Sequence, residues 1–381
     1  MKKIFKIVGI TLLLMLFIFI SIDAKLPVDG DYYVYFGSHG KGPGCGFSLA
    51  HFNSATGKLS TPVFFKEAVA PAFFIINKVG NRLYTCNSAP GSGVSAYSID
   101  PATANLELLN EKPSCGGDPS YVSLDATEHF VMEANYDGKS IAVYALKTDG
   151  SIGKRTAFAE HSGTSINPER QSQPRPHCIC ADPSNNFVLV PDLGVDKLYV
   201  YRFDSKNGTL KPNEPTFASV LPGSGPRHVI FSADSRYAYL INEMGSSIIR
   251  FEWNSTKGTL KQFETYSTLP ADFTGKSTCA EILVHPNGKF IYATNRGHNS
   301  VTVFSVDQKT GKLELLQHIS TQGKTPRNCE LDPTGKWLLV SNQDSNNAVV
   351  FSINPQKGIL TQTGEPVSVT SPFCERFLKI K

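Results

Sequence analysis

The sequence predicts an all-β protein, a seven-bladed β-propeller with four antiparallel strands in each blade. Three observations lead to this prediction. One pattern of strand, polar turn and strand recurs six times along 381 residues; no helical periodicity separates the copies; and the last residues look like the strand that the first copy lacks. A single ring of repeated blades accounts for a chain of this length without a second globular domain.

The repeat is clearest in residues 225–248, GPRHVIFSADSRYAYLINEMGSSI, which return as residues 325–348, TPRNCELDPTGKWLLVSNQDSNNA. Each copy has a residue that is usually proline sixteen positions before an asparagine or aspartate. Between these positions lie two short apolar segments joined by a polar turn, which is the pattern of a β-hairpin. The six pairs are Pro71 and Asn87, Pro119 and Asn135, Pro176 and Asp192, Pro226 and Asn242, Cys279 and Asn295, and Pro326 and Asn342.

Two further strands complete each predicted blade. A third strand follows the hairpin, for example KLYVYRF at residues 197–203 and SIIRFEW at residues 247–253. A turn with a stereotyped sequence comes next, NGTL, KGTL, TGKL or KGIL, in which glycine supplies the positive φ of a tight turn. A fourth strand then leads to the next copy, so each unit of about fifty residues predicts one propeller blade.

The two ends of the chain are expected to share one blade. The segment YYVYFGSHG at residues 32–40 matches a second strand and puts Ser38 at the asparagine position. The C-terminal segment SPFCERFLKI at residues 371–380 matches a first strand, with Pro372 at the proline position. We therefore expect the C-terminal strand to complete the first blade and to close a ring without exposed sheet edges. An open solenoid, the alternative, would leave both ends uncapped.

The N-terminus has the features of a secretory signal peptide. Three lysines precede an apolar run over residues 7–20, and Ala24 offers a small residue for cleavage. We expect residues 1–24 to be removed and residues 25–381 to form an exported propeller domain, periplasmic or extracellular, without stable membrane insertion. An uncleaved anchor is the alternative. Without the signal lysines the formal charge of +4 falls close to neutrality, which gives no electrostatic basis for a nucleic-acid partner.

Eight cysteines remain in the exported part of the chain. Export permits disulfides, but several of these cysteines lie in apolar strand patterns, where a free thiol behaves as a small hydrophobic group. We expect mostly buried thiols and at most one or two disulfides. The spacing of Cys178 and Cys180 does not fit a zinc site, and we expect neither a metal nor an organic cofactor.

Positions that differ between the copies are the candidates for function. In each blade the start of the first strand and the end of the second meet at the same rim of the central channel. The recurring proline and asparagine are scaffold, whereas charged and imidazole side chains gather just after them in blades four to seven. The predicted catalytic residues are His177, Glu243, Arg227 and Arg296, and the predicted substrate-binding residues are Arg327, His228, Glu281 and Asn328.

Each of these residues also has a structural interpretation. Arg227 with Glu243, or Arg296 with Glu281, would be ordinary ion pairs in a propeller without a site. His228 alternates in direction with Arg227 on a regular strand and would then be a hydrogen-bonded core residue. Because several such groups converge on one rim, we favour a functional site, since charged groups of this kind tend to mark function.

Aligned by blades, the chain resembles the lactonase family of seven-bladed propellers, which includes propeller-type 6-phosphogluconolactonases and fungal carboxy-cis,cis-muconate cyclases. The segments that carry the resemblance are QPRPHC, GPRHVIF, LINE, ATNRGHNSV and VPDLGVDKLYVY. The resemblance covers nearly all of the exported chain. It implies that His177, Arg227, Glu243 and Arg296 carry catalysis and binding, and it implies lactone chemistry.

Opening a lactone requires a base that activates water, a positive group that faces the oxyanion, and a cation that holds an acidic group of the substrate. Glu243 or His177 can be the base, and Arg227 and Arg296 can bind the oxyanion and a carboxylate or phosphate. We expect a monomeric, 6-phosphogluconolactonase-like hydrolase that acts on a sugar-derived lactone. The alternatives are a muconate-type lactonising cyclase and a non-catalytic propeller that binds a partner on its rim.

Overall fold

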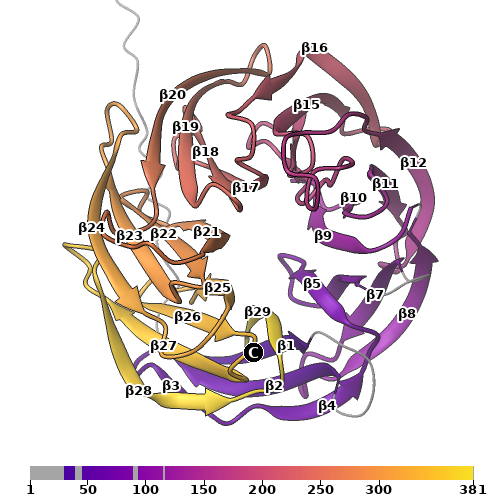
Figure 1. Ribbon diagram of the computed structural model, residues 1–381. Coiled ribbons are helices and arrows are strands. Elements are labelled where there is room, and N and C mark those ends of the chain that lie inside the picture. The colour runs from indigo at the N-terminus through magenta and orange to yellow at the C-terminus, as the bar shows by residue number, and fades with distance from the viewer. Residues whose placement is uncertain (1–29, 39–44, 89–92, 115, 381) are drawn as a thin grey trace, which may run out of the picture.

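The computed structural model describes residues 30–38, 45–88, 93–114 and 116–380. The described residues form seven sheets arranged as the blades of a ring around a central channel (Figure 1). All regular elements are strands, and neighbouring strands within each blade are antiparallel. The predicted seven-bladed propeller is therefore confirmed. The predicted signal peptide, residues 1–24, lies outside the described residues.

Blades two to seven each consist of four consecutive strands, and the first strand of each blade lies nearest the channel (Figure 1). Blade two contains β5 (Pro71–Ile76), β6 (Arg82–Asn87), β7 (Gly93–Ile99) and β8 (Leu106–Pro113). Blade three contains β9 (Pro119–Leu124), β10 (Phe130–Asn135), β11 (Ser140–Leu146) and β12 (Ile152–Glu160). Blade four contains β13 (Cys180–Ala181), β14 (Phe187–Asp192), β15 (Lys197–Asp204) and β16 (Thr209–Ser219).

The second half of the ring has the same order of strands. Blade five contains β17 (Pro226–Phe231), β18 (Tyr237–Asn242), β19 (Ser247–Asn254) and β20 (Thr259–Ser267). Blade six contains β21 (Thr278–Val284), β22 (Phe290–Arg296), β23 (Ser300–Val306) and β24 (Leu313–Ser320). Blade seven contains β25 (Pro326–Leu331), β26 (Trp337–Asn342), β27 (Asn347–Ile353) and β28 (Leu360–Ser368).

Blade one is built from both ends of the chain and closes the ring. Its innermost strand is the C-terminal β29 (Pro372–Lys379), which pairs with β1 (Asp31–Ser38), and β1 pairs with β2 (Gly46–Asn53). Two short strands, β3 (Lys58–Leu59) and β4 (Val63–Glu67), both pair with β2 on the outside. Ser38 lies opposite Pro372, as the repeat predicts. This closure ties the two ends of the described chain together within one sheet.

The register of the strands reproduces the sixteen-residue spacing of the repeat. All six predicted pairs are directly opposite one another in the sheets. In blade four the pair Pro176 and Asp192 forms an isolated bridge, because β13 is only two residues long. The spacing therefore fixes where each inner hairpin begins and ends at the rim of the channel.

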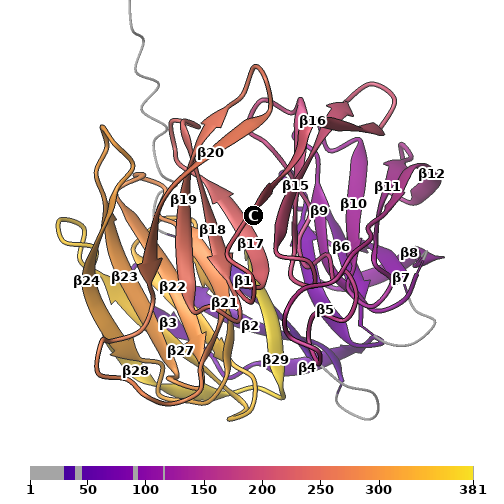
Figure 2. The ribbon, with the colours of Figure 1, turned by 45° about the horizontal axis from the view of Figure 1, so that its top comes forward.

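Burial falls from the channel outward within a blade. The second strand of blade three, β10, is buried along its whole length, because its two faces pack against neighbouring blades. The outermost strand of blade five, β20, is mostly exposed or only partly buried and carries several charged and polar residues. Figure 2 shows these outermost strands on the periphery of the ring. Large apolar side chains between blades hold the ring together through the hydrophobic effect.

The glycine of the stereotyped outer turn has a steric role between blades. Gly258 of blade five has φ +69°, and a Cβ atom there would lie 2.3 Å from the Phe187 ring of blade four. Gly358 of blade seven bears the same relation to Phe290 of blade six. Only glycine combines the left-handed backbone with this close approach, so in these two blades the turn sequence recognised in the repeat also packs the blade against the one before it.

Most of the cysteines that the structure describes are buried, as predicted. Cys86, Cys178, Cys279, Cys329 and Cys374 are buried free thiols. Burial raises the pKa of the Cys86 and Cys329 thiols well above the usual value, which keeps them protonated and poorly reactive. In the described part of the chain there is no helix long and apolar enough to cross a membrane.

Candidate active site

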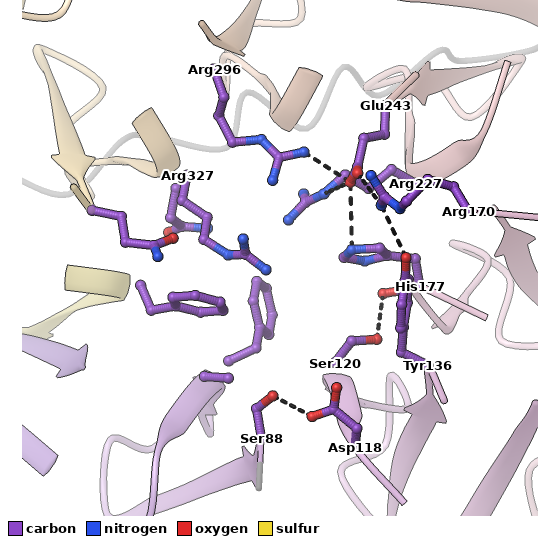
Figure 3. A pocket seen from close by; sticks show the side chains of 15 residues that line it. Ser88, Asp118, Ser120, Tyr136, Arg170, His177, Arg227, Glu243, Arg296 and Arg327 are labelled. Atoms are coloured by element: carbon purple, nitrogen blue, oxygen red, sulfur yellow. Dashed lines mark hydrogen bonds and ion pairs between the residues drawn. The ribbon is translucent and has the colours of Figure 1, made fainter. Parts of the chain in front are cut away.

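A cavity of about 290 Å³ opens at one rim of the channel, and all seven blades contribute to its wall (Figure 3). Its size lies near the lower end of the roughly 300–1,000 Å³ typical of small-molecule sites. Most of the lining residues directly follow the aligned proline or the aligned asparagine, as the sequence predicts. The lining comprises Ala72, Phe73, Ser88, Asp118, Ser120, Tyr136, Arg170, His177, Arg227, Glu243, Arg296, Arg327, Asn328, Gln343 and Phe373.

β-Bulges aim the residues after the prolines into this cavity. In blade five Pro226 is opposite Asn242 and His228 is opposite Ile241, so Arg227 is the extra residue of the bulge. Arg327 has the same position in blade seven. A bulged residue leaves the regular alternation of a strand and can point in a new direction. The bulge therefore explains why Arg227 and Arg327 enter the cavity.

Glu243 is the centre of an ion-pair cluster (Figure 3). Its Oε1 lies 2.6 Å from Nη2 of Arg170, and its Oε2 lies 2.9 Å from Nη2 of Arg296 and 3.2 Å from Nε of Arg227. Burial alone would raise the pKa of Glu243, but the electrostatic influence of Arg296, of the nearby imidazole of His177, and of Arg227 and Arg170 outweighs it and holds the pKa well below the usual value. Glu243 is therefore ionised at neutral pH, and its oxygens are already occupied by arginines.

His177 lies beside this cluster, and its imidazole ring makes no hydrogen bond to Glu243. Its Nε2 is 3.8 Å from Oε2 of Glu243, which is too far for a hydrogen bond. Its Nδ1 is buried without a hydrogen-bond partner. Burial, followed by the charge of Arg227, lowers the pKa of His177 well below its usual value. The ring is neutral at pH 7 and can accept a proton.

The opposite part of the wall contains an arginine without a carboxylate. The guanidinium carbon of Arg327 lies 3.6 Å from the centre of the Phe373 ring, and no ion pair joins Arg327 to an acidic residue within the described chain. Burial and the charges of Arg296 and Arg227 lower its pKa. Four arginines and two carboxylates line the cavity, so it carries an excess of positive charge suited to an anionic ligand.

Two of the predicted substrate-binding residues, His228 and Glu281, do not line the cavity. Nδ1 of His228 is 2.8 Å from Oε1 of Glu281, and the side-chain amide of Asn328 donates to Oε2 of Glu281 at 2.6 Å. Of these three residues only Asn328 lines the cavity. His228 thus takes the hydrogen-bonded core position that the alternative interpretation described. The alternative pair of Arg296 and Glu281 does not form, because Arg296 binds Glu243.

Comparison with known proteins assigns the chain to a family. The model of the family described as "Lactonase, 7-bladed beta-propeller" matches residues 33–377. The chain belongs to this lactonase family. The resemblance stated from the sequence is therefore confirmed.

Individual members of the lactonase family support the same assignment. A 6-phosphogluconolactonase of Bacillus subtilis is 36% identical over 348 residues, which are 91% of this chain and 98% of the relative. A 6-phosphogluconolactonase of Formosa agariphila is 29% identical over 299 residues, 77% of this chain and 84% of the relative. The structure of a periplasmic gluconolactonase of Pseudomonas aeruginosa superposes with a TM-score of 0.87 at 30% identity and covers 92% of this chain and 100% of its own.

Arg170 is the main residue of this lactonase-family site that the repeat did not reveal. It lies in the polar insertion between β12 and β13, which the repeat alignment skips. The insertion is anchored on Asp196, which accepts hydrogen bonds from Ser165 at 2.6 Å and from Gln171 at 2.8 Å. This anchoring holds Arg170 over Glu243 and Tyr136. The only signal in the sequence was that a charged insertion leads into His177.

Proposed function

We propose that this protein hydrolyses a sugar-derived lactone that carries one acidic group. The observation that carries the proposal is the neutral His177, which stands beside an arginine-bound carboxylate in a cavity with excess positive charge. The 6-phosphogluconolactonases and the gluconolactonase among its relatives support a sugar lactone as the substrate class.

His177 is the proposed general base. Glu243 is the less suitable base, because three arginines hold its pKa well below the usual range and occupy its oxygens. In the proposed reaction His177 Nε2 accepts a proton from water as the water oxygen bonds to the lactone carbonyl carbon. The imidazolium that forms is stabilised by the negative charge of Glu243, 3.8 Å away.

Arg227 and Arg296 are the proposed oxyanion-stabilising groups. The Nε–H of Arg296 has no hydrogen-bond acceptor in the described chain, and both guanidinium groups are held in place by Glu243, which Arg227 contacts through Nε and Arg296 through Nη2. Negative charge develops on the carbonyl oxygen when water adds, and fixed cations stabilise it without reorganisation. The ring C–O bond then breaks, the imidazolium of His177 returns its proton to the leaving ring oxygen, and a hydroxy acid is released.

Arg327 is the proposed partner of the acidic group of the substrate. It faces the cavity from blade seven, across the channel from His177 in blade four (Figure 3). Since no carboxylate of the described chain pairs with it, its charge is available for a carboxylate or phosphate. In the proposed complex the reacting carbonyl and the anionic group of the substrate lie at opposite ends of the cavity.

We also propose that the enzyme acts outside the cytoplasm after residues 1–24 are removed. The lysines and the apolar run of the N-terminus support this location. The similarity to a periplasmic gluconolactonase of Pseudomonas aeruginosa supports it as well.

The test is a panel of aldonolactones, including glucono-δ-lactone and its 6-phosphate, incubated with the purified protein while proton release is followed. We expect hydrolysis above the spontaneous rate, and we expect the acceleration to vanish in the double variant Arg227→Ala, Glu243→Gln. No acceleration on any lactone would contradict the proposal and would leave the cyclase and the binding propeller as the interpretations to pursue.

A further inference from the structure

Ser88 and Asp118 form a polar pair on the side of the cavity away from the arginine cluster (Figure 3). The Ser88 hydroxyl donates a short hydrogen bond to Oδ1 of Asp118. The other carboxylate oxygen of Asp118 points into the cavity (Figure 3), and within the described chain no protein donor reaches it. One oxygen is therefore fixed by the protein and the other is available to a ligand.

Asp118 differs in its electrostatic surroundings from the other acidic residue in the wall. Glu243 is in contact with three arginines, whereas no lysine, arginine or histidine of the described residues forms an ion pair with Asp118. The cavity is consequently divided into a positive side and a side with one uncompensated carboxylate. A ligand that enters it meets opposite charges at its two ends.

The aspartate is not required by the fold. Asp118 precedes the aligned proline of blade three and has φ +43°. The same position has a positive φ in four other blades, where Ala70, Gly225, Thr325 and Ser371 occupy it. The left-handed backbone is therefore a property of the scaffold, and the scaffold accepts alanine, glycine, threonine or serine there. A carboxylate occurs at this position only in blade three among the described blades, and there it faces the cavity.

We propose that Asp118, oriented by Ser88, is a specificity-determining residue that accepts a hydrogen bond from a hydroxyl group of the lactone and repels a second anionic group. The proposal rests on the lactone hydrolysis proposed above. A carboxylate accepts strong hydrogen bonds from hydroxyl groups, and the same carboxylate disfavours another carboxylate because like charges repel in a partly buried site.

The proposed role of Asp118 predicts which chemical classes of lactone the cavity accepts. A hydroxylated lactone with one acidic group satisfies both sides of the cavity, with the acidic group on Arg327 and a hydroxyl on Asp118. A lactone with carboxylates at both ends, of the kind that a muconate-type cyclase forms, would place one of them against Asp118. The residue therefore distinguishes the hydrolase from the cyclase interpretation.

The experiment compares Asp118→Ala and Asp118→Asn with the unaltered protein on three lactones: glucono-δ-lactone, δ-valerolactone, which has no hydroxyl groups, and a dicarboxylate lactone. In Asp118→Ala we expect KM for glucono-δ-lactone to rise roughly tenfold or more, as for a lost hydrogen bond to a charged group, with kcat and the values for δ-valerolactone little changed. In Asp118→Asn we expect KM for the dicarboxylate lactone to fall several-fold. The control is Asp272→Ala, an exposed aspartate outside the cavity.

Equal changes on glucono-δ-lactone and δ-valerolactone, or an unchanged preference in both variants, would overturn the role of Asp118. If the unaltered protein hydrolyses none of the lactones, the proposed reaction fails, and calorimetric binding of gluconate decides the inference separately. Binding at least tenfold weaker in Asp118→Ala than in the unaltered protein would support the hydroxyl contact. Equal binding in the two proteins, or no binding to either, would overturn it.

Discussion

Two buried carboxylates of this propeller, Glu243 and Glu375, show opposite protonation behaviour. Glu243, at the rim, is surrounded by three arginines, and its pKa is held well below the usual value. Glu375, on the innermost strand β29, is fully buried, and burial raises its pKa to about 8 despite the nearby charge of Arg376. Burial is common to both residues. The number of arginines in contact decides which carboxylate is ionised.

The surroundings of Glu375 explain the difference further. Glu330 and Glu281 lie near enough to raise its pKa, and Arg376 bonds to Glu330 at 3.0 Å. Around Glu375, one arginine, Arg376, therefore lies near several carboxyl groups. In the cavity, by contrast, three arginines contact the single carboxylate of Glu243. The rim therefore keeps a permanent negative charge on Glu243, which fixes the positions of its arginines. The buried carboxyl group of Glu375 keeps its proton instead.

Of the three substitutions that test this contrast, Glu243→Gln should disrupt the arrangement of the rim arginines most strongly. It leaves three arginines without their carboxylate, and removing one partner of a buried ion pair costs about 3–5 kcal/mol of unfolding free energy. We also expect kcat/KM for the lactone to fall by roughly 10²–10³, because the oxyanion-binding guanidinium groups lose their fixed positions. Urea unfolding and lactone hydrolysis measure the two effects. Unchanged stability and activity would show that Glu243 does not organise the site.

Arg170→Gln should have an intermediate effect. Arg170 contacts Glu243 at 2.6 Å, but its side chain is 39% exposed, so water screens its charge. We expect kcat/KM to fall by roughly tenfold, which corresponds to about 1.4 kcal/mol, with little loss of stability. Glu169→Gln is the control, since Glu169 belongs to the same insertion, is exposed, and does not line the cavity. Equal losses in both variants would assign the effect to the insertion rather than to the contact with Glu243.

Glu375→Gln should have the smallest effect on lactone hydrolysis, and its effect on stability should run in the opposite direction as the pH rises. Because the folded-state pKa of about 8 exceeds the usual value of about 4.3, the folded protein binds this proton more tightly than the unfolded chain. Its contribution to stability is complete below about pH 4 and is lost as the pH rises to about 8. The amide cannot ionise, so within this window the dependence of unfolding free energy on pH should weaken by up to about 1.4 kcal/mol per pH unit.

Denaturant unfolding at several pH values measures this change, and lactone hydrolysis should be unaffected. An equally steep pH dependence in Glu375→Gln would mean that Glu375 is already ionised at neutral pH. The contrast with Glu243 would then disappear.

The repeat predicted the fold and most of the cavity wall, because a sixteen-residue spacing within a hairpin places the same positions at the same rim of every blade. The repeat could not show that Arg227 lines the cavity and His228 does not, because the directions of these side chains depend on the β-bulge at Arg227. It missed Arg170, which lies in an insertion without a counterpart in other blades. Asp118 was missed because it precedes the aligned proline rather than following it.

The sequence also could not predict the protonation state of His177. The sequence does not decide between His177 and Glu243 as the base, because the choice depends on how many arginines contact Glu243. The three arginines that contact Glu243 come from blades five and six and from the insertion. Such a convergence from separate segments has no local signature in the chain.

The most direct test of the account is the rate of hydrolysis of glucono-δ-lactone 6-phosphate, which carries one acidic group, by the unaltered protein, by His177→Gln and by His51→Gln at neutral pH. His51 is an exposed histidine on β2, far from the rim residues in sequence and outside the cavity wall. The account predicts hydrolysis above the spontaneous rate, a fall of roughly 10²–10⁴ in His177→Gln as for a lost general base, and no change in His51→Gln. Full activity in His177→Gln would contradict the assignment of the base and, with it, the central role of this rim.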